Sequence, residues 1–130
     1  MKKIVIICLL IGFSSCTSQE KKQIAFVDIH VEEFQKAIKK NDIQLVDVRT
    51  PKEFKQGHIK NAQLINFFDA NFKSNFKNKL DKNRAVYLYC RSGGRSAKAA
   101  KMFKEAGFRK VYNLLGGFNA WSKSEQEIEK

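Results

Sequence analysis

The chain has 130 residues, of which 43% are hydrophobic, and it contains a single proline. This length allows one domain with a substantial core but no second domain, and the composition argues against disorder. The formal net charge is +12, from 25 Lys and Arg residues against 13 Asp and Glu residues. The lysines are scattered along the chain and form no dense basic stretch with interleaved aromatics, so we do not expect a nucleic-acid partner. The charge favours small anionic ligands instead.

The first residues are typical of a secretory signal peptide. Lys2 and Lys3 form a short basic region, and residues 4–13 form an apolar run that is far too short to span a bilayer. Small residues then precede Cys16. We therefore expect residues 1–15 to be a cleaved signal and the protein to be exported to the bacterial cell envelope or periplasm.

The stretch 12–16 also resembles the lipobox of bacterial lipoproteins, in which a cysteine follows small residues. The resemblance implies that Cys16 becomes the lipid-modified first residue and attaches the protein to a membrane. Residues 16–23 would then be the lipidated cysteine and a polar tether. A plain cleaved signal or an uncleaved anchor is the alternative, because the leucine usual in a lipobox is missing from its upstream position.

Residues 24–123 show the pattern of one domain with alternating strands and helices, and we expect residues 124–130 to be a polar, frayed tail. Short runs rich in β-branched and aromatic residues indicate strands, and apolar residues at helical spacing indicate helices. Such alternation predicts an α/β sandwich around a mainly parallel sheet of about five strands. The expected strands cover 25–29, 43–48, 63–67, 85–89 and 110–114. The expected helices cover 31–40, a helix that begins at Pro51 after a Thr50 cap, 69–80 capped by Asp69, 96–106, and a last helix opened by 116–121.

The loop between the strand at 85–89 and the next helix combines features that would activate a thiol. Cys90 lies at the carboxyl end of the strand, and the loop turns through glycines into a helix N-terminus. Such a loop can direct several backbone N–H groups inward, and the helix dipole and nearby guanidinium groups add positive potential. All of these favour the nucleophilic thiolate. The candidate site residues are therefore Cys90, Arg91, Ser92, Gly93, Gly94, Arg95 and Ser96.

The simpler interpretation is that Cys90 is an inert buried thiol and that the glycines only turn the chain. The combination of strand, glycine loop, arginine pair and helix argues against it. Cys8 would leave with the signal and Cys16 would carry lipid, so Cys90 would be the only free thiol. We find no metal-ligand cluster in the sequence, and we expect no metal site.

The loop from Cys90 to Arg95 resembles the active-site loop of the rhodanese-like sulfurtransferase family, which has the form C-x4-R. Two further blocks match the family in the same order: D-V-R, E-F, G-H-I and A over 47–62, and G-G-x-x-x-W over 116–121. The resemblance implies a rhodanese-like three-layer fold and a cysteine that carries sulfur as a persulfide. It also implies supporting roles for Asp47 and Arg49, and no cofactor. Phe67 departs from the family, since a proline commonly stands there.

The resemblance predicts a thiosulfate sulfurtransferase type of enzyme, with a small anionic sulfur donor and a thiol, cyanide or protein as acceptor. The alternative is a module that carries persulfide or senses redox state and docks a partner without efficient turnover. Phosphatases and arsenate reductases of the same fold have a loop one residue longer, so phosphoryl or arsenate chemistry is disfavoured. We expect His58 to fix a turn and Trp121 to pack in the core, and neither to act in the chemistry.

Overall fold

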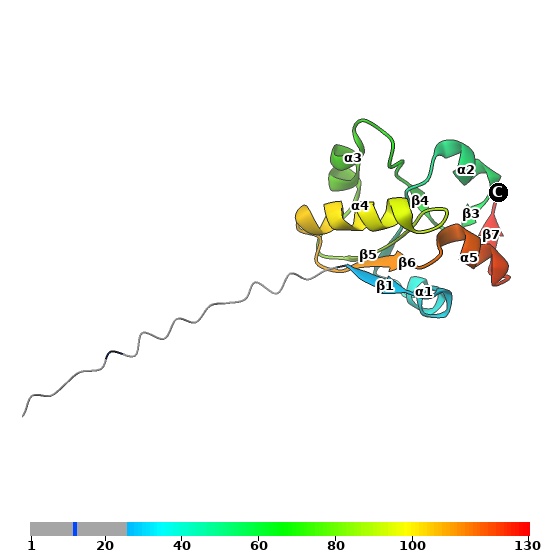
Figure 1. Ribbon diagram of the computed structural model, residues 1–130, viewed down its shortest axis with the longest axis horizontal. Coiled ribbons are helices and arrows are strands. Elements are labelled where there is room, and N and C mark those ends of the chain that lie inside the picture. The colour runs from blue at the N-terminus through cyan, green and yellow to red at the C-terminus, as the bar shows by residue number, and fades with distance from the viewer. Residues whose placement is uncertain (1–11, 13–25) are drawn as a thin grey trace, which may run out of the picture.

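The computed structural model describes residue 12 and residues 26–130, which form a sheet with helices on both sides (Figure 1). The expected signal at 1–15 and the tether with Cys16 lie outside the described residues, apart from residue 12. Within the described part of the chain, none of the helices has the length and apolar character needed to cross a bilayer.

The main sheet has five parallel strands in the order β1-β6-β5-β2-β4. The central strands β2 and β5 are buried along nearly their whole length, as expected for strands covered on both faces. This confirms the predicted α/β fold with a mainly parallel sheet. The strands are β1 (Val27–Ile29), β2 (Ile43–Asp47), β4 (Gln63–Leu64), β5 (Ala85–Tyr89) and β6 (Val111–Leu114).

The helices cover both faces of this sheet and define two cores. Residues of α3 and α4 pack on one face, and residues of α1 and α5 pack on the other. Strand β5 contributes to both, because its side chains alternate: Val86 and Leu88 face α3 and α4, whereas Tyr87 and Tyr89 face α1 and α5. The helices are α1 (Val31–Ile38), α2 (Pro51–Gln56), α3 (Phe72–Lys79), α4 (Gly94–Glu105) and α5 (Gly117–Lys123).

The start of α2 is the best example of a helix boundary that the sequence determines. The Thr50 hydroxyl accepts a hydrogen bond from the Glu53 amide, and the Glu53 carboxylate accepts one from the Thr50 amide. Pro51 occupies the first turn, where no intrahelical N–H partner is needed. This capping box confirms the predicted start of the helix and fixes the backbone that carries Glu53.

The helix predicted over 69–80 begins later than expected. Asp69 does not cap it; its carboxylate accepts a hydrogen bond from the Asn71 amide, and its carbonyl accepts one from the Phe72 amide. These bonds close a local turn, a conformation that aspartate side chains favour, and the helix starts only at Phe72. In contrast, α4 begins two residues earlier than predicted, at Gly94.

The expectation of a frayed carboxyl-terminal tail is wrong for its last residues. Strand β7 (Ile128–Glu129) pairs antiparallel with β3 (His58–Ile59), forming a second, two-stranded sheet. The Trp121 indole donates a hydrogen bond to the carbonyl of Glu127, which ties the tail to α5. The polar composition concealed this pairing because the hydrogen bonds come from the backbone.

Candidate active site

Cys90 lies at the carboxyl end of β5, at the centre of the sheet, where the chain turns into α4. The side chain is almost completely buried, with 1% of the residue exposed. Because side chains alternate along β5, Cys90 lies on the same face as Val86 and Leu88. It therefore joins the core that these residues form with α3 and α4. Ligand sites of parallel α/β sheets form at this edge, because the loops after the strands gather there.

The environment of the sulfur favours the thiolate. The Gly93 amide donates a hydrogen bond to Cys90 Sγ at 3.1 Å, and the Ser96 hydroxyl donates one at 3.3 Å. Burial works against ionisation, but the hydrogen bonds from the Ser96 hydroxyl and from the amides of Ser96, Gly93 and Ser92 outweigh it and lower the pKa of the thiol below its ordinary value. The Gly93 amide therefore points toward the sulfur, and these contacts favour the anionic form of Cys90 over the neutral thiol.

The first residues of α5 hold the loop in this conformation from outside. The amide of Phe118 donates to the carbonyl of Cys90 at 2.8 Å, and the amide of Asn119 donates to the carbonyl of Arg91 at 3.0 Å. With these carbonyls bound to α5, the amides that follow are free to turn toward the sulfur. The contact requires glycine at 117, because a Cβ there would lie 2.5 Å from the Cys90 carbonyl oxygen.

Gly93 makes the turn into α4 possible. Its φ of 108° lies in the left-handed region, which side chains other than hydrogen rarely allow. This conformation directs the Gly93 amide back to the sulfur while the chain enters the helix at Gly94. The N-terminus of α4 thus lies beside Cys90, where its dipole adds to the stabilisation of an anion.

Arg95 is not a free cation, because Glu53 binds it. Two parallel hydrogen bonds of 2.8 Å each join the Arg95 guanidinium to the Glu53 carboxylate. The hydrogen bonds from Arg95 lower the pKa of Glu53 to about 2, with further help from Thr50 and against a burial effect. Arg95 also lies over the ring of Phe68, which is 66% exposed. Nothing in the sequence predicted this pair, although the capping box had already assigned Glu53 a structural role.

Arg91 differs from Arg95 in its surroundings. Arg91 and Ser92 are both exposed at the outer side of the loop. Among residues 26–130, no side-chain hydrogen bond or ion pair of Arg91 satisfies ordinary distance limits, so its charge remains available to a ligand. Of the two loop arginines, Arg91 is therefore the one that can meet an incoming anion.

Asp47 and Arg49 form a buried pair next to the loop, at the end of β2. Three hydrogen bonds of 2.7–3.0 Å join the Arg49 guanidinium to the Asp47 carboxylate, and a fourth joins it to the Gly57 carbonyl. The guanidinium lies 4.2 Å from the centre of the Phe118 ring and 5.5 Å from that of Tyr89. The pair thus contacts Tyr89, which precedes Cys90, and Phe118, whose amide binds the Cys90 carbonyl.

His58 has the structural contacts that the sequence predicted. Its ring stacks on Phe54 at 3.7 Å, its Nδ1 lies 3.0 Å from the Phe54 carbonyl, and its Nε2 lies 3.3 Å from Glu129. Trp121 is buried against Phe34 in the α1 and α5 core, also as predicted. In the part of the chain from 26 onward, we find no group of His, Cys, Asp or Glu side chains arranged to hold a metal ion.

A pocket of about 500 Å³ lies apart from the loop. Its walls come from the end of α1, the start of β2, and the β3 and β7 region, and residues 90–96 do not contribute to it. The chemistry assigned to Cys90 therefore does not use this pocket. Glu53, Phe68, Gly117 and Phe118 contact the loop or its arginine, and the sequence did not predict these contacts.

Comparison with known proteins agrees with this geometry. Residues 30–124 match the model of the rhodanese-like domain. The protein YqhL of Bacillus subtilis is 40% identical over 90 residues, which cover 69% of this chain and 68% of YqhL. The thiosulfate sulfurtransferase GlpE of Coxiella burnetii is 36% identical over 84 residues, covering 65% of this chain and 76% of GlpE. The crystal structure of a rhodanese-like domain protein from Staphylococcus aureus superimposes with a TM-score of 0.68 at 33% identity, covering 81% of this chain and 100% of that one.

Proposed function

The chain belongs to the rhodanese-like domain family, and from this premise we propose that it is a sulfurtransferase that uses Cys90 to carry sulfur. The donor is thiosulfate or a similar small anion with a sulfane sulfur, and the acceptor is a thiol, cyanide or a protein. The observation that carries the proposal is the pair of hydrogen bonds that the Gly93 amide and the Ser96 hydroxyl donate to Cys90 Sγ. The reaction needs no cofactor.

In the first step the Cys90 thiolate attacks the sulfane sulfur of the donor. A new S–S bond forms to Cys90 Sγ, the S–S bond of thiosulfate breaks, and sulfite leaves with the bonding electron pair. The exposed charge of Arg91 attracts the anionic donor and the departing sulfite. The same inward amides and the α4 dipole stabilise the negative charge of the persulfide.

In the second step the acceptor takes the outer sulfur. A thiolate or cyanide attacks that atom, the persulfide S–S bond breaks, and its electron pair returns to Cys90 as thiolate. The enzyme therefore alternates between a thiol form and a persulfide form, which predicts ping-pong kinetics. The Glu53–Arg95 pair keeps the loop in one shape during both steps, because it joins α2 to the first turn of α4.

Steady-state kinetics with thiosulfate and cyanide test this proposal. Parallel lines in double-reciprocal plots, together with loss of the activity in Cys90→Ser, would support a transferase. Persulfide that forms on Cys90 but is not turned over would favour the alternative, a module that carries persulfide or senses redox state for a partner. Hydrolysis of an aryl phosphate, without sulfur transfer, would contradict both.

We also propose that the protein acts outside the cytoplasm, attached to a membrane through lipid on Cys16. Support comes from the sequence: a basic start, a short apolar run at 4–13, and small residues before a cysteine. Labelling of cells with a radioactive fatty acid tests this directly. Label on the parent chain and none on Cys16→Ser is the expected result, and unlabelled full-length protein in the cytoplasm would contradict it.

A further inference from the structure

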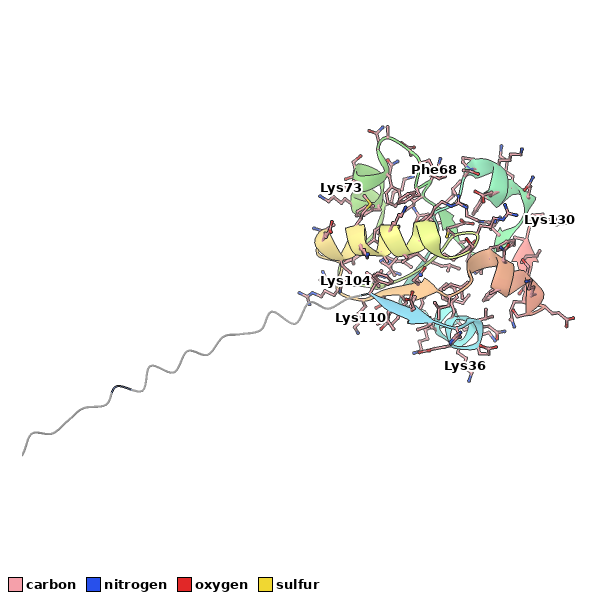
Figure 2. The ribbon with its side chains drawn as sticks, in the orientation of Figure 1. Lys36, Phe68, Lys73, Lys104, Lys110 and Lys130 are labelled. Carbon is pink, nitrogen blue, oxygen red and sulfur yellow. The ribbon has the colours of Figure 1, made fainter. Side chains whose placement is uncertain are left out.

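Four basic residues lie at the end of the sheet where the parallel strands β5 and β6 begin, opposite the end that carries Cys90. Lys82 precedes β5, Lys110 precedes β6, and Lys104 and Arg109 lie on either side of the turn that ends α4. Because the strands are parallel, the residues before β5 and β6 lie at the same edge of the sheet. Lys104 and Lys110 are labelled at this end of the domain in Figure 2. We call these four residues the basic edge.

Backbone and side-chain contacts hold the basic edge together. The Lys104 ammonium donates to the Arg109 carbonyl at 2.7 Å, and the Arg109 amide donates to the Lys82 carbonyl at 3.3 Å. The Lys110 carbonyl accepts from the Val86 amide at 2.9 Å. Lys82, which comes before β5, is therefore a neighbour in space of the three basic residues that follow at the end of α4 and before β6.

The charge of the basic edge is not neutralised by ion pairs. Over residues 26–130, the ion pairs within 4.0 Å involve other cations, such as Arg84 with Asp42. The acidic residues nearest to these four in the sequence are Asp81 and Glu105. Both are exposed, and neither forms an ion pair with a residue of the basic edge. Like charges held close together raise the free energy of the domain unless an anion lies opposite them.

The chain enters the domain beside this edge. Strand β1 runs parallel to β6 with Val27 opposite Tyr112, so the entry into β1 lies next to Lys110, at the left of the sheet in Figure 1. Cys90 follows the other end of β5, a strand of five residues and hence about 17 Å long. The entry into β1 and the basic edge therefore lie at one end of the domain, and the Cys90 loop lies at the other.

We propose that the basic edge binds an anionic membrane surface, through the phosphates of anionic lipid headgroups. Basic residues close to a membrane gain free energy from its negative surface potential within a Debye length. The binding orients the domain, so that the Cys90 loop faces solvent and its donors and acceptors. The proposal rests on the proposed membrane attachment for its biological setting, but the surface itself can be tested on the unmodified chain.

The test is co-sedimentation of the full 130-residue chain with vesicles at low and high salt. One set contains phosphatidylcholine alone and the other contains phosphatidylcholine with phosphatidylglycerol. The residues before the domain are identical in every variant, so a difference between variants on the anionic vesicles reports on the domain. Since the chain carries no lipid in this assay, failure of lipidation at Cys16 would not affect the result.

The test variant replaces Lys82, Lys104, Arg109 and Lys110 by glutamine. The matched control also removes four charges, by replacing four exposed lysines away from this edge: Lys36, Lys55, Lys123 and Lys130. We expect the test variant to lose at least about tenfold in affinity for the anionic vesicles, given the attraction that each basic residue contributes, and the control to lose much less. Sulfur transfer to cyanide should remain unchanged in both, which also shows that they fold.

Equal losses in the two variants would overturn the proposal, because net charge alone would then explain the binding. Unchanged binding in the test variant would overturn it as well. Tighter binding to duplex DNA than to vesicles, lost in the same variant, would assign the edge to nucleic acid instead. If the fourfold variant does not fold, Lys82→Gln with Lys110→Gln keeps the Lys104 contact intact and should still lose binding that a paired control, Lys36→Gln with Lys55→Gln, keeps.

Discussion

Replacing Ser96 by alanine should raise the pKa of the Cys90 thiol and slow persulfide formation. The Ser96 hydroxyl lies 3.3 Å from Cys90 Sγ and is fully buried, so water cannot take its place. A hydrogen bond to a charged group contributes about 1.5–3 kcal/mol, and a long bond to a diffuse sulfur anion belongs at the lower end. A loss of about 1.5 kcal/mol corresponds to roughly tenfold less thiolate at a pH below the pKa of the thiol.

The assay is the rate of persulfide formation from thiosulfate as a function of pH. The profile of Ser96→Ala should lie at higher pH than that of the parent, with a similar plateau where the thiol is fully ionised. Ser92→Ala is the matched control, because the Ser92 side chain is exposed and its amide, which alanine keeps, is the group that stabilises the thiolate. A Ser96→Ala profile that overlays the parent would refute the role of this hydroxyl.

Three further predictions concern the residues that hold the loop. Gly117→Ala should lower the free energy of unfolding by about 1–3 kcal/mol and reduce transfer, since its Cβ would lie 2.5 Å from the Cys90 carbonyl oxygen. Gly94→Ala, with nothing within 4 Å of its Cβ, should leave the free energy of unfolding unchanged, and equal losses in the two variants would contradict the packing argument. Glu53→Gln should lower the free energy of unfolding, measured in urea, by about 1 kcal/mol, because Arg95 loses its bidentate partner. An unchanged urea midpoint would show that the pair does not stabilise the domain. The pKa of Glu53 is lowered to about 2, so the stability from its carboxylate is complete above about pH 4.5 and is lost as the pH falls toward 2. The free energy of unfolding of the parent, measured in urea across this range, should therefore decrease more steeply with falling pH than that of Glu53→Gln. Parallel curves for the two proteins would contradict this explanation.

Much of the fold could be predicted because local signals agreed with one another. The capping box at Thr50 and Glu53 set the start of α2, and the alternation of strand-like and helical stretches set the parallel sheet. Cys90 stood out because its strand, its glycine loop and the following helix each point to an activated thiol. These are features of neighbouring residues, which a sequence displays directly.

What the sequence did not predict depends on contacts between distant residues. The Glu53–Arg95 pair joins residues 42 positions apart, and the fit of Gly117 against Cys90 depends on how α5 meets the loop. The pairing of β7 with β3 uses backbone groups, so its polar sequence gave no sign of it. The basic edge was missed for a similar reason, because Lys82 joins Lys104, Arg109 and Lys110 only when β5 pairs with β6.

A sulfurtransferase that works through Cys90 must accept sulfur on this residue as a persulfide. Intact-mass spectrometry after mixing the protein with thiosulfate under non-reducing conditions measures this directly. We predict a gain of one sulfur atom, located on the Cys90 peptide, released by cyanide, and missing in Cys90→Ser. An unchanged mass of the folded protein, with thiosulfate and with every other sulfane donor tried, would contradict a role of Cys90 as the sulfur carrier.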